Sequence, residues 1–455
     1  MTGKKTLPEK IPLGGGITLF PGKAVKNSPR HCVPGAVYSL DERNAFCAEL
    51  DGLAMDVMIC AKLGRLEEIA QLQFLSTLRL NGQGIRGLYP HTFGHNRLVH
   101  SARVSALALV MAKSYGLSNS EKDKLTVAGL LHDVFTCAGG DSWKDINCQG
   151  TLFDEDNDFA GKIFRYFGPS WKTLCARYGW NPETMAREIA DIVAGKGLLG
   201  GVQEIADTAS YMLGDLEEIR RAARRHKNPQ DFARILQAAE RPWDVWNHIS
   251  VCGGKVMVTD PVTLNNFLML RILLWVDLYQ SPRHKFLEQL MLKIVFPYLV
   301  DKKAIKISEL PIKDDCWLHG AISRHMGLSD VQVRHLDLLG GFPKLKTFAN
   351  MNEALAWEEE KYRAGVATFV YDARQFQPTK TKVDKYCVVG KDGRPQTFAE
   401  AYPTHASAIS QIARQATAPE KPIYVAWVEK PDISDNYRRA WESARARWRK
   451  PRIEE

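Results

Sequence analysis

The chain has 455 residues, which suffices for one large domain with an appendage or for two domains. Its 45% hydrophobic and 25% charged residues are typical of a globular protein in water. No run approaches the ~20 apolar residues that a membrane span needs. The formal net charge of +9 favours anionic partners such as nucleotides or nucleic acid.

The N-terminus and the cysteines indicate the compartment. Basic residues at the start are not followed by the apolar segment of a secretory signal. The nine cysteines are scattered and form no CxxC pair, which favours free thiols over disulfides. We therefore expect a cytoplasmic protein.

Patterning along the chain predicts a mainly α protein with a smaller C-terminal α+β lobe. Residues 1–40 are rich in Gly and Pro and predict an extended N-terminal arm. From 41 to 350, apolar residues recur at helical spacing, which predicts an all-helical core. From 351 to 455, short β-prone runs such as ATFVYD and PIYVAWVE predict the lobe, which ends in a basic helix.

Within the helical core, the first polar positions of interest are Arg97 and His100, three residues apart and so on one helical face. A second apolar helix ends in LLHDV, which places His132 and Asp133 beside buried leucines. An unpaired carboxylate there would cost several kcal/mol, and a metal ion that accepts imidazole and carboxylate ligands removes that cost.

A third piece is the run EIADTASYMLGDLEE, in which Asp207, Tyr211 and Asp215 form one helical stripe. The two histidines, Asp133 and Asp207 together predict one divalent ion per chain, Mn, Fe, Mg or Co. Such an ion would activate water and polarise a phosphoryl group, and Arg97 would hold the phosphate oxygens. Each piece also has a plain alternative: a chance HD dipeptide, a core histidine at His100, and a surface charge at Asp215.

The C-terminal run NYRRAWESARARWRKPR holds seven Arg or Lys residues and one Glu, with Trp441 and Trp448 among them. Such a helix can bind nucleic acid through phosphate contacts and stacking. The alternative is a terminal helix whose tryptophans pack against the lobe while its charges face water. We favour the packed helix.

The segment FLSTLRLNGQGIRGLYPHTFGHNRLVHSARV, LLHDV and the Asp-x-x-x-Tyr-x-x-x-Asp stripe resemble the HD-domain deoxynucleoside triphosphate triphosphohydrolases. The resemblance covers roughly residues 70–345. It implies a homo-oligomer, a nucleotide substrate and roles for several residues. The metal ligands would be His100, His132, Asp133 and Asp207, and the nucleotide-binding residues would be Gln83, which reads the sugar, Arg97, Tyr211 and Asp215.

The chain departs from this family in two places. Thr136 and Asp141 stand where the family has histidines that assist catalysis, and the family's Tyr-Gln pair is not found in the run EQLMLKI. The segment after His132 is acidic instead. One of its carboxylates replaces the histidine as general acid or base, with Asp141 ranked first, or the segment is a solvated loop. Its acidic residues are Asp141, Asp145, Asp154, Glu155, Asp156 and Asp158.

We therefore expect metal-dependent hydrolysis of a dNTP to deoxynucleoside and triphosphate, by attack of water on the α-phosphorus. Two alternatives stay open. One is an HD phosphohydrolase that acts on another nucleotide, and the other is a nucleotide-sensing or nucleic-acid-binding module with little turnover.

Overall fold

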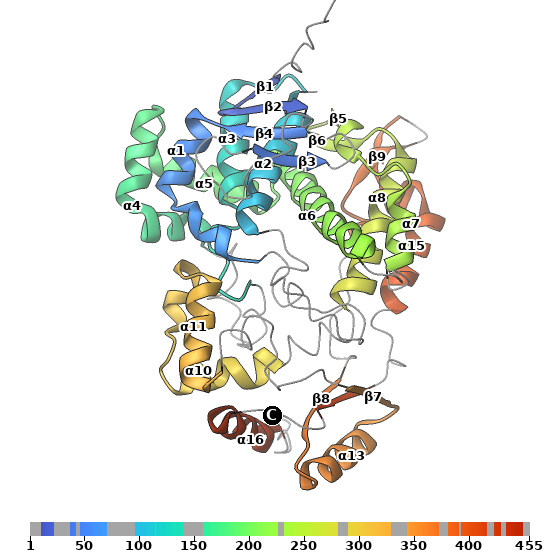
Figure 1. Ribbon diagram of the computed structural model, residues 1–455. Helices are drawn as coiled ribbons and strands as arrows, with labels where there is room; N and C mark the ends of the chain where they lie inside the picture. The colour runs from blue at the N-terminus through green and yellow to red at the C-terminus, as the bar shows by residue number, and fades with distance from the viewer. Residues whose placement is uncertain are drawn as a thin grey trace, which may run out of the picture.

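The computed structural model describes most of the chain. The described residues are 11–21, 37–41, 46–70, 96–113, 115–140, 158–225, 232–280, 290–328, 344–372, 381–390, 393–415, 423–428 and 434–448. Helices dominate, and three small sheets accompany them, which confirms the mainly α fold class (Figure 1).

An antiparallel sheet near the N-terminus replaces much of the predicted arm. Its order is β1-β2-β4-β3, and its strands are β1 (Ile11–Gly14), β2 (Ile17–Pro21), β4 (Phe46–Leu50) and β3 (Val37–Asp41). The glycines read as a loop signal form the turn of the β1–β2 hairpin, where Gly16 has a positive φ and lies against the backbone of Asp51. Because Leu13, Ile17 and Leu19 are buried, an unpacked arm is wrong for this hairpin.

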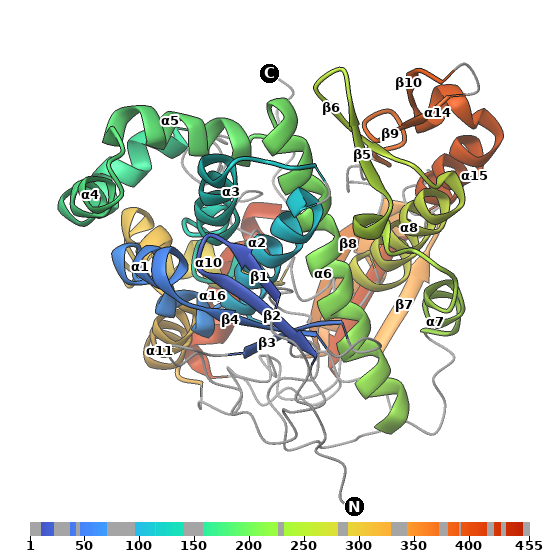
Figure 2. The same cartoon turned by 90° about the horizontal axis from the view of Figure 1, so that it is seen from above.

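The helices behind this sheet form the main core, and the sheet crosses in front of α2 in the view of Figure 2. Helix α2 is central, packs against both α3 and α6, and has nearly all of its side chains buried. The elements are α1 (Gly52–Cys60), the 3-10 helix η2 (Leu63–Glu68), α2 (Arg97–Lys113), α3 (Asn119–Leu131), α4 (Phe159–Arg177), α5 (Pro182–Val193) and α6 (Gly197–Arg225).

A second group of elements lies beside α6 and includes part of the C-terminal region. Strand β6 pairs in parallel with β9, so residues 381–415 join the main hydrophobic core rather than a separate lobe. The elements are α7 (Ala233–Ala239), η6 (Val245–Asn247), β5 (Ile249–Cys252), β6 (Lys255–Val258), α8 (Pro261–Leu273), the π-helix η7 (Leu274–Tyr279), β9 (Cys387–Val389), β10 (Pro395–Thr397), α14 (Phe398–Ala401) and α15 (Pro403–Gln415).

The remaining elements lie at the bottom of Figure 1. A three-stranded sheet, β7-β11-β8, packs against α13, while α16 packs against α11 and η8. The elements are η8 (Met291–Val295), α10 (Phe296–Asp301), η9 (Ile307–Ile312), α11 (Asp315–Met326), β7 (Lys344–Phe348), α13 (Met351–Arg363), β8 (Ala367–Asp372), β11 (Ile423–Val428) and α16 (Asp435–Trp448). The α+β lobe is therefore smaller than 351–455, and it shares contacts with the helical part.

Helix α16 is packed as the favoured alternative predicted. Trp441 is buried, and its Nε1 donates to the Thr368 carbonyl oxygen over 2.9 Å. Arg445 pairs with Glu358 at 3.0 Å and lies over the ring of Tyr362. Nucleic-acid binding by this helix stays a prediction, and its remaining candidates include exposed arginines rather than Trp441.

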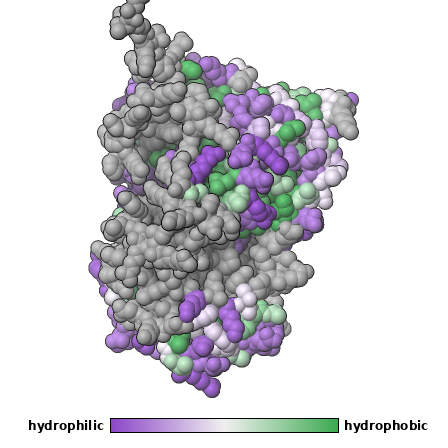
Figure 3. Space-filling model, turned by 45° about the vertical axis from the view of Figure 1, so that its right-hand side comes forward, coloured by the Kyte–Doolittle hydropathy of each residue, from purple (hydrophilic) through white to green (hydrophobic). Residues whose placement is uncertain are grey.

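Within the described ranges, one segment, Pro261–Tyr279, is long and apolar enough to cross a membrane, yet 61% of its most apolar window is buried within the protein. It forms α8 and η7, whose residues belong to the main core. On the face drawn in Figure 3, hydrophobic residues of the described surface are scattered among hydrophilic ones.

Candidate metal centre

Three helices deliver the predicted ligands, each at a place its local sequence fixes. Helix α2 begins at Arg97, where the Asn96 side chain accepts from the backbone N–H of Val99, and His100 follows one turn later. Helix α3 begins with a capping box at Ser118 and ends with His132 as its C-cap. Asp207 lies within the long helix α6.

The structure brings these side chains together. The Nε2 atoms of His100 and His132 are 3.1 Å apart, and the Asp207 Oδ1 lies 3.0 Å from the first and 3.7 Å from the second. Donors on a metal with bonds of ~2.1 Å stand about 3 Å apart when adjacent, so this trio has the spacing of a ligand set. The Asp133 Oδ2 stands beside it, 3.6 and 3.5 Å from the two Nε2 atoms.

The second set of contacts orients both imidazoles toward a cation. The Nδ1 of His132 donates to the Gly129 carbonyl over 2.9 Å. The Ser210 hydroxyl donates to the His100 carbonyl over 3.1 Å, which leaves its oxygen to accept from the His100 Nδ1 at 2.9 Å. Both Nε2 atoms then present lone pairs to one another and to carboxylates, an arrangement that is repulsive unless a cation lies between them. The residues therefore fit a divalent ion.

The electrostatics of His100 and the two aspartates agree with that assignment. Burial lowers the pKa of His132, but the charges of Asp133 and Asp207 outweigh it, so without a metal ion that pKa is raised. Burial lowers the pKa of His100 and keeps its imidazole neutral, the form that binds metal. Burial alone would raise the pKa of Asp207, but His100, His132 and Lys382 outweigh it and hold that pKa below its usual range. Burial likewise opposes ionisation of Asp133, and the charge of Arg97 overcomes it, so the pKa of Asp133 is lowered.

Arg97 lies where the sequence predicted, but it faces Asp133. Its Nη1 donates to the Asp133 Oδ2 over 2.8 Å, and both side chains are almost wholly buried. The guanidinium therefore holds the carboxylate next to the histidines. Its predicted contact with substrate phosphate stays a prediction.

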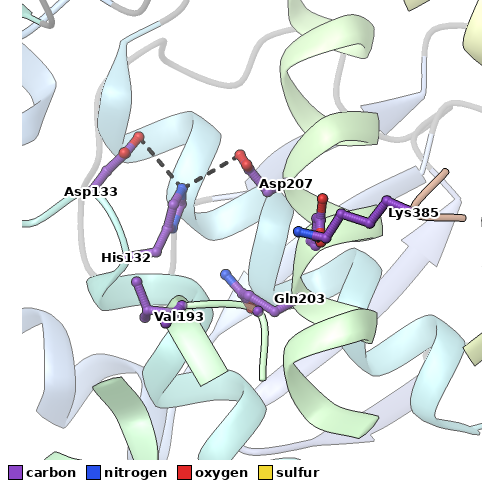
Figure 4. A pocket seen from close by; sticks show the side chains of 9 residues that line it. His132, Asp133, Val193, Gln203, Asp207 and Lys385 are labelled. Atoms are coloured by element: carbon purple, nitrogen blue, oxygen red, sulfur yellow. Dashed lines mark ion pairs between the residues drawn. The ribbon is translucent and has the colours of Figure 1, made fainter. Parts of the chain in front are cut away.

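A cavity of about 270 Å³ opens beside the cluster. In Figure 4, Asp133 and Lys385 stand at opposite ends of it, with His132, Asp207 and Gln203 between them. The loop from α5 to α6 closes one side. The lining residues are His132, Asp133, Val193, Ala194, Gly195, Gln203, Glu204, Asp207 and Lys385. The sequence did not predict three of these lining residues, Gln203, Glu204 and Lys385. They belong to no recognisable motif, and Lys385 is 178 positions away from Asp207.

Of the three residues in the α6 stripe, Asp207 lines this cavity, whereas Tyr211 and Asp215 are not among its lining residues. Asp215 is fully buried and accepts from the hydroxyl of Tyr279, at the end of η7. Tyr211 and the buried Arg271 hydrogen-bond to one another. The plain alternative of a surface charge at Asp215 is therefore wrong. Arg271 and Tyr279 were also missed, although Tyr279 and Gln280 are a Tyr-Gln pair that lies upstream of the run EQLMLKI.

Several other predicted positions play no part in the described site. Gln83 and Asp141 lie outside the described residues, as do Asp145, Asp154, Glu155 and Asp156. Asp158 is exposed, lies 3.7 Å from Arg165 and is not among the residues that line the cavity. Thr136 is buried, and its carbonyl accepts from Arg65 over 2.9 Å.

Comparison with known families agrees with this geometry. Residues 97–250 match the model of the HD domain family. This span contains the candidate metal centre, which consists of Arg97, His100, His132, Asp133 and Asp207. This part of the chain is therefore similar to an HD domain. Proteins with this domain bind divalent metals, and in this chain the trio of His100, His132 and Asp207 provides the place for one.

A solved structure supports the same fold outside the matched span. The chain is similar to the crystal structure of a phosphohydrolase from Bacteroides thetaiotaomicron, with a TM-score of 0.51 and 14% sequence identity. The likeness covers 86% of this chain and 99% of that one. No curated protein matches the chain.

Proposed function

We propose that this protein is a metal-dependent phosphohydrolase that converts a dNTP to deoxynucleoside and triphosphate. The observation that carries the proposal is the trio of His100, His132 and Asp207, of which His100 is buried and the other two face a cavity. The HD domain and the structural neighbour, itself named a phosphohydrolase, support the reaction class. The dNTP substrate rests on the resemblance of the sequence around Arg97 and of the stripe from Asp207 to Asp215.

The residues of the chain divide the work. His100, His132, Asp133 and Asp207 would hold one divalent ion, which when bound supplies Lewis-acid polarisation of the phosphoryl group and lowers the pKa of water. Arg97 keeps the Asp133 carboxylate in place at 2.8 Å. The Ser210 hydroxyl and the Gly129 carbonyl keep both imidazoles in the tautomer that exposes Nε2.

Proton supply to the leaving group separates this proposal from its alternative. Attack at the α-phosphorus expels the 5′-oxygen of the sugar, which needs a proton, whereas cleavage of an anhydride expels a better leaving group. Thr136, at the position of a family histidine, is buried and does not line the cavity. This favours, as second candidate, a phosphohydrolase that cleaves a different bond or another nucleotide. A nucleotide-sensing module with little turnover would use the same cavity.

A substrate screen tests the proposal. Purified protein is incubated with dNTPs, NTPs and nucleoside monophosphates in Mn, Mg, Co or Fe, and the products are identified by mass. We expect deoxynucleoside and triphosphate in equal amounts from at least one dNTP. Phosphate or pyrophosphate as product would instead support the second candidate.

Two variants connect the products to the centre. His132→Ala should lose both the bound metal and the turnover, because it removes one of three clustered donors. His405→Ala, at an exposed position on α15, should change neither. Full metal occupancy in the His132 variant would contradict the ligand assignment.

A further inference from the structure

The side of the cavity formed by α6 holds a buried amide that has no hydrogen-bond partner among the described residues. Gln203 lies on α6, one turn before Asp207, and its side chain lines the cavity. The residue is only 3% exposed, yet neither its Nε2 nor its Oε1 has a hydrogen-bond partner in the part of the chain that the structure describes. Buried polar atoms are almost always paired, so an unpaired amide facing a cavity points to a ligand that pairs with it.

Two lysines from the C-terminal part of the chain stand on the same side. The Nζ of Lys385 makes an ion pair with Glu204, which follows Gln203 on α6. The Nζ of Lys382 lies 3.3 Å from the other Glu204 oxygen and donates to the Thr208 hydroxyl over 3.0 Å. Both ammonium groups therefore lie within about one helical turn of Asp207 along α6.

The backbone that carries these lysines is held firmly in place. Tyr386 is buried against Phe267, and its hydroxyl donates to Thr208 over 3.1 Å. Strand β9 then pairs with β6. Lys382 itself has φ of +61°, a left-handed conformation that lysine rarely adopts and that clusters at functional sites. A rigid support of this kind is what a binding site needs.

The charges around the cavity suit an anion once a metal is bound. Three carboxylates, those of Asp133, Asp207 and Glu204, are balanced by the cations of Arg97, Lys382 and Lys385. A divalent ion at the histidines would therefore leave the site positive. The side chain of Lys385 is 55% exposed and flexible, so its ammonium can leave Glu204 for a phosphate oxygen.

We propose that Gln203, Lys382 and Lys385 form a phosphate-binding wall, which contacts the phosphate chain of the substrate while its reacting phosphorus lies at the metal cluster. The Gln203 amide N–H group donates to a phosphate oxygen, and the two ammonium groups neutralise the chain. This inference rests on the proposed function for its substrate, but the wall itself follows from the unpaired amide and the two lysines.

Binding of inorganic triphosphate to the Mn-loaded full-length protein, measured by calorimetry, tests the wall without turnover. Gln203→Leu and Lys385→Met should each weaken it by roughly tenfold or more, the scale of one hydrogen bond to a charged group. KM for the dNTP should rise by a similar factor, and metal content should not change. Lys385→Arg should retain most of the affinity, because it keeps the charge.

Controls separate binding from folding. Lys124→Met removes a lysine from a comparable ion pair with Glu188, 2.9 Å long and outside the cavity, and should leave triphosphate affinity unchanged. The melting temperature of Gln203→Leu should equal or exceed that of the wild type, since the variant removes an unpaired buried amide.

Three results would overturn the proposed wall. The wild type could fail to bind triphosphate, or both variants could bind triphosphate with an affinity within about twofold of the wild-type value. The third result is a Gln203→Leu variant that loses affinity for the dNTP but not for triphosphate. The last result would assign Gln203 to the nucleoside. If the screen finds no hydrolysed compound but triphosphate binding follows the expected pattern, the proposed function fails and the wall stands.

Discussion

At the residue scale, α6 exposes one ionisable group to the cavity and buries another. Asp207 is ionised because the histidines hold its pKa low, whereas the fully buried Asp215 has a pKa of about 7. Burial is the main cause of the rise, and the hydroxyl of Tyr279 and the charge of Arg103 oppose it. Two aspartates eight positions apart on one stripe therefore differ in charge near neutral pH.

Asp215 gives a prediction for stability against pH. Its folded-state pKa of about 7 lies above the ordinary value of 3.8, so the folded state binds a proton that the unfolded state releases. The resulting stabilisation is present below the lower value and is lost as pH rises to the higher one. In urea unfolding, Asp215→Asn, which cannot ionise, should already gain somewhat on the wild type at pH 5, which lies above the ordinary value of 3.8, and the gain should grow as pH rises. At pH 8.5 it should be more stable, by on the order of 2–4 kcal/mol. Equal stability at both pH values would contradict the raised pKa.

At the element scale, the turn after α3 is fixed by residues far from it in sequence. Arg65, in η2, donates to the carbonyls of Val134, Thr136 and Lys313 over 2.6, 2.9 and 2.7 Å. Asp315, the first residue of α11, accepts from the backbone of Gly139 over 2.7 Å. These contacts hold the chain directly after the metal ligands, and so they fix the direction in which His132 and Asp133 leave the helix.

Arg65→Met should therefore lower the free energy of unfolding by about 2–4 kcal/mol, because it leaves three carbonyls without their donor. Metal should also dissociate faster, as followed by competition with a chelator. Arg65→Lys should not restore either property, since an ammonium cannot reproduce the planar fork. Arg187→Met, which removes an exposed arginine that donates to the Glu183 carbonyl, is the control and should change stability little. Wild-type chelator kinetics in Arg65→Met would show that the turn needs no such support.

At the scale of the whole molecule, the C-terminal region contributes to two places. Residues 381–415 complete the main core and bring two lysines to the cavity, while α16 completes the smaller core next to α11. Removing α16 would also remove the buried Tyr437 and Trp441 and uncover the smaller core that they pack in, so point substitutions test its surface more cleanly than truncation does. Its outward face still carries exposed arginines, including Arg438 and Arg439.

If this face binds nucleic acid, Arg438→Glu with Arg439→Glu should weaken binding of a single-stranded oligonucleotide at low salt and flatten its dependence on salt concentration. The melting temperature should not change, because both side chains are exposed. Lys172→Glu with Arg187→Glu, exposed on α4 and α5, makes the same charge change elsewhere and should have little effect. Equal loss in both double variants would mean that net charge alone drives binding, and no binding by the wild type would leave α16 a packing element.

Sequence patterns were enough to predict that His100, His132 and Asp207 lie together, because each belongs to a pattern of helical period. Arg97 and His100 lie one turn apart, and His132 and Asp133 end an apolar helix. Helical spacing of buried residues also determined the mainly α class.

The distant segments that meet at the cavity could not be predicted in this way, because they are brought together by the fold. Lys382 and Lys385 reach Glu204 because β9 pairs with β6, and pairing between strands more than a hundred residues apart leaves no local signal. The prediction of an extended arm failed at the hairpin Ile11–Pro21 for a related reason. Its glycines indicate a turn both in an extended arm and in a packed hairpin, and Leu13 and Ile17 are buried only because the assembled helices cover them. The raised pKa of Asp215 could not be predicted from the sequence either, because desolvation depends on all the residues packed around the carboxyl group.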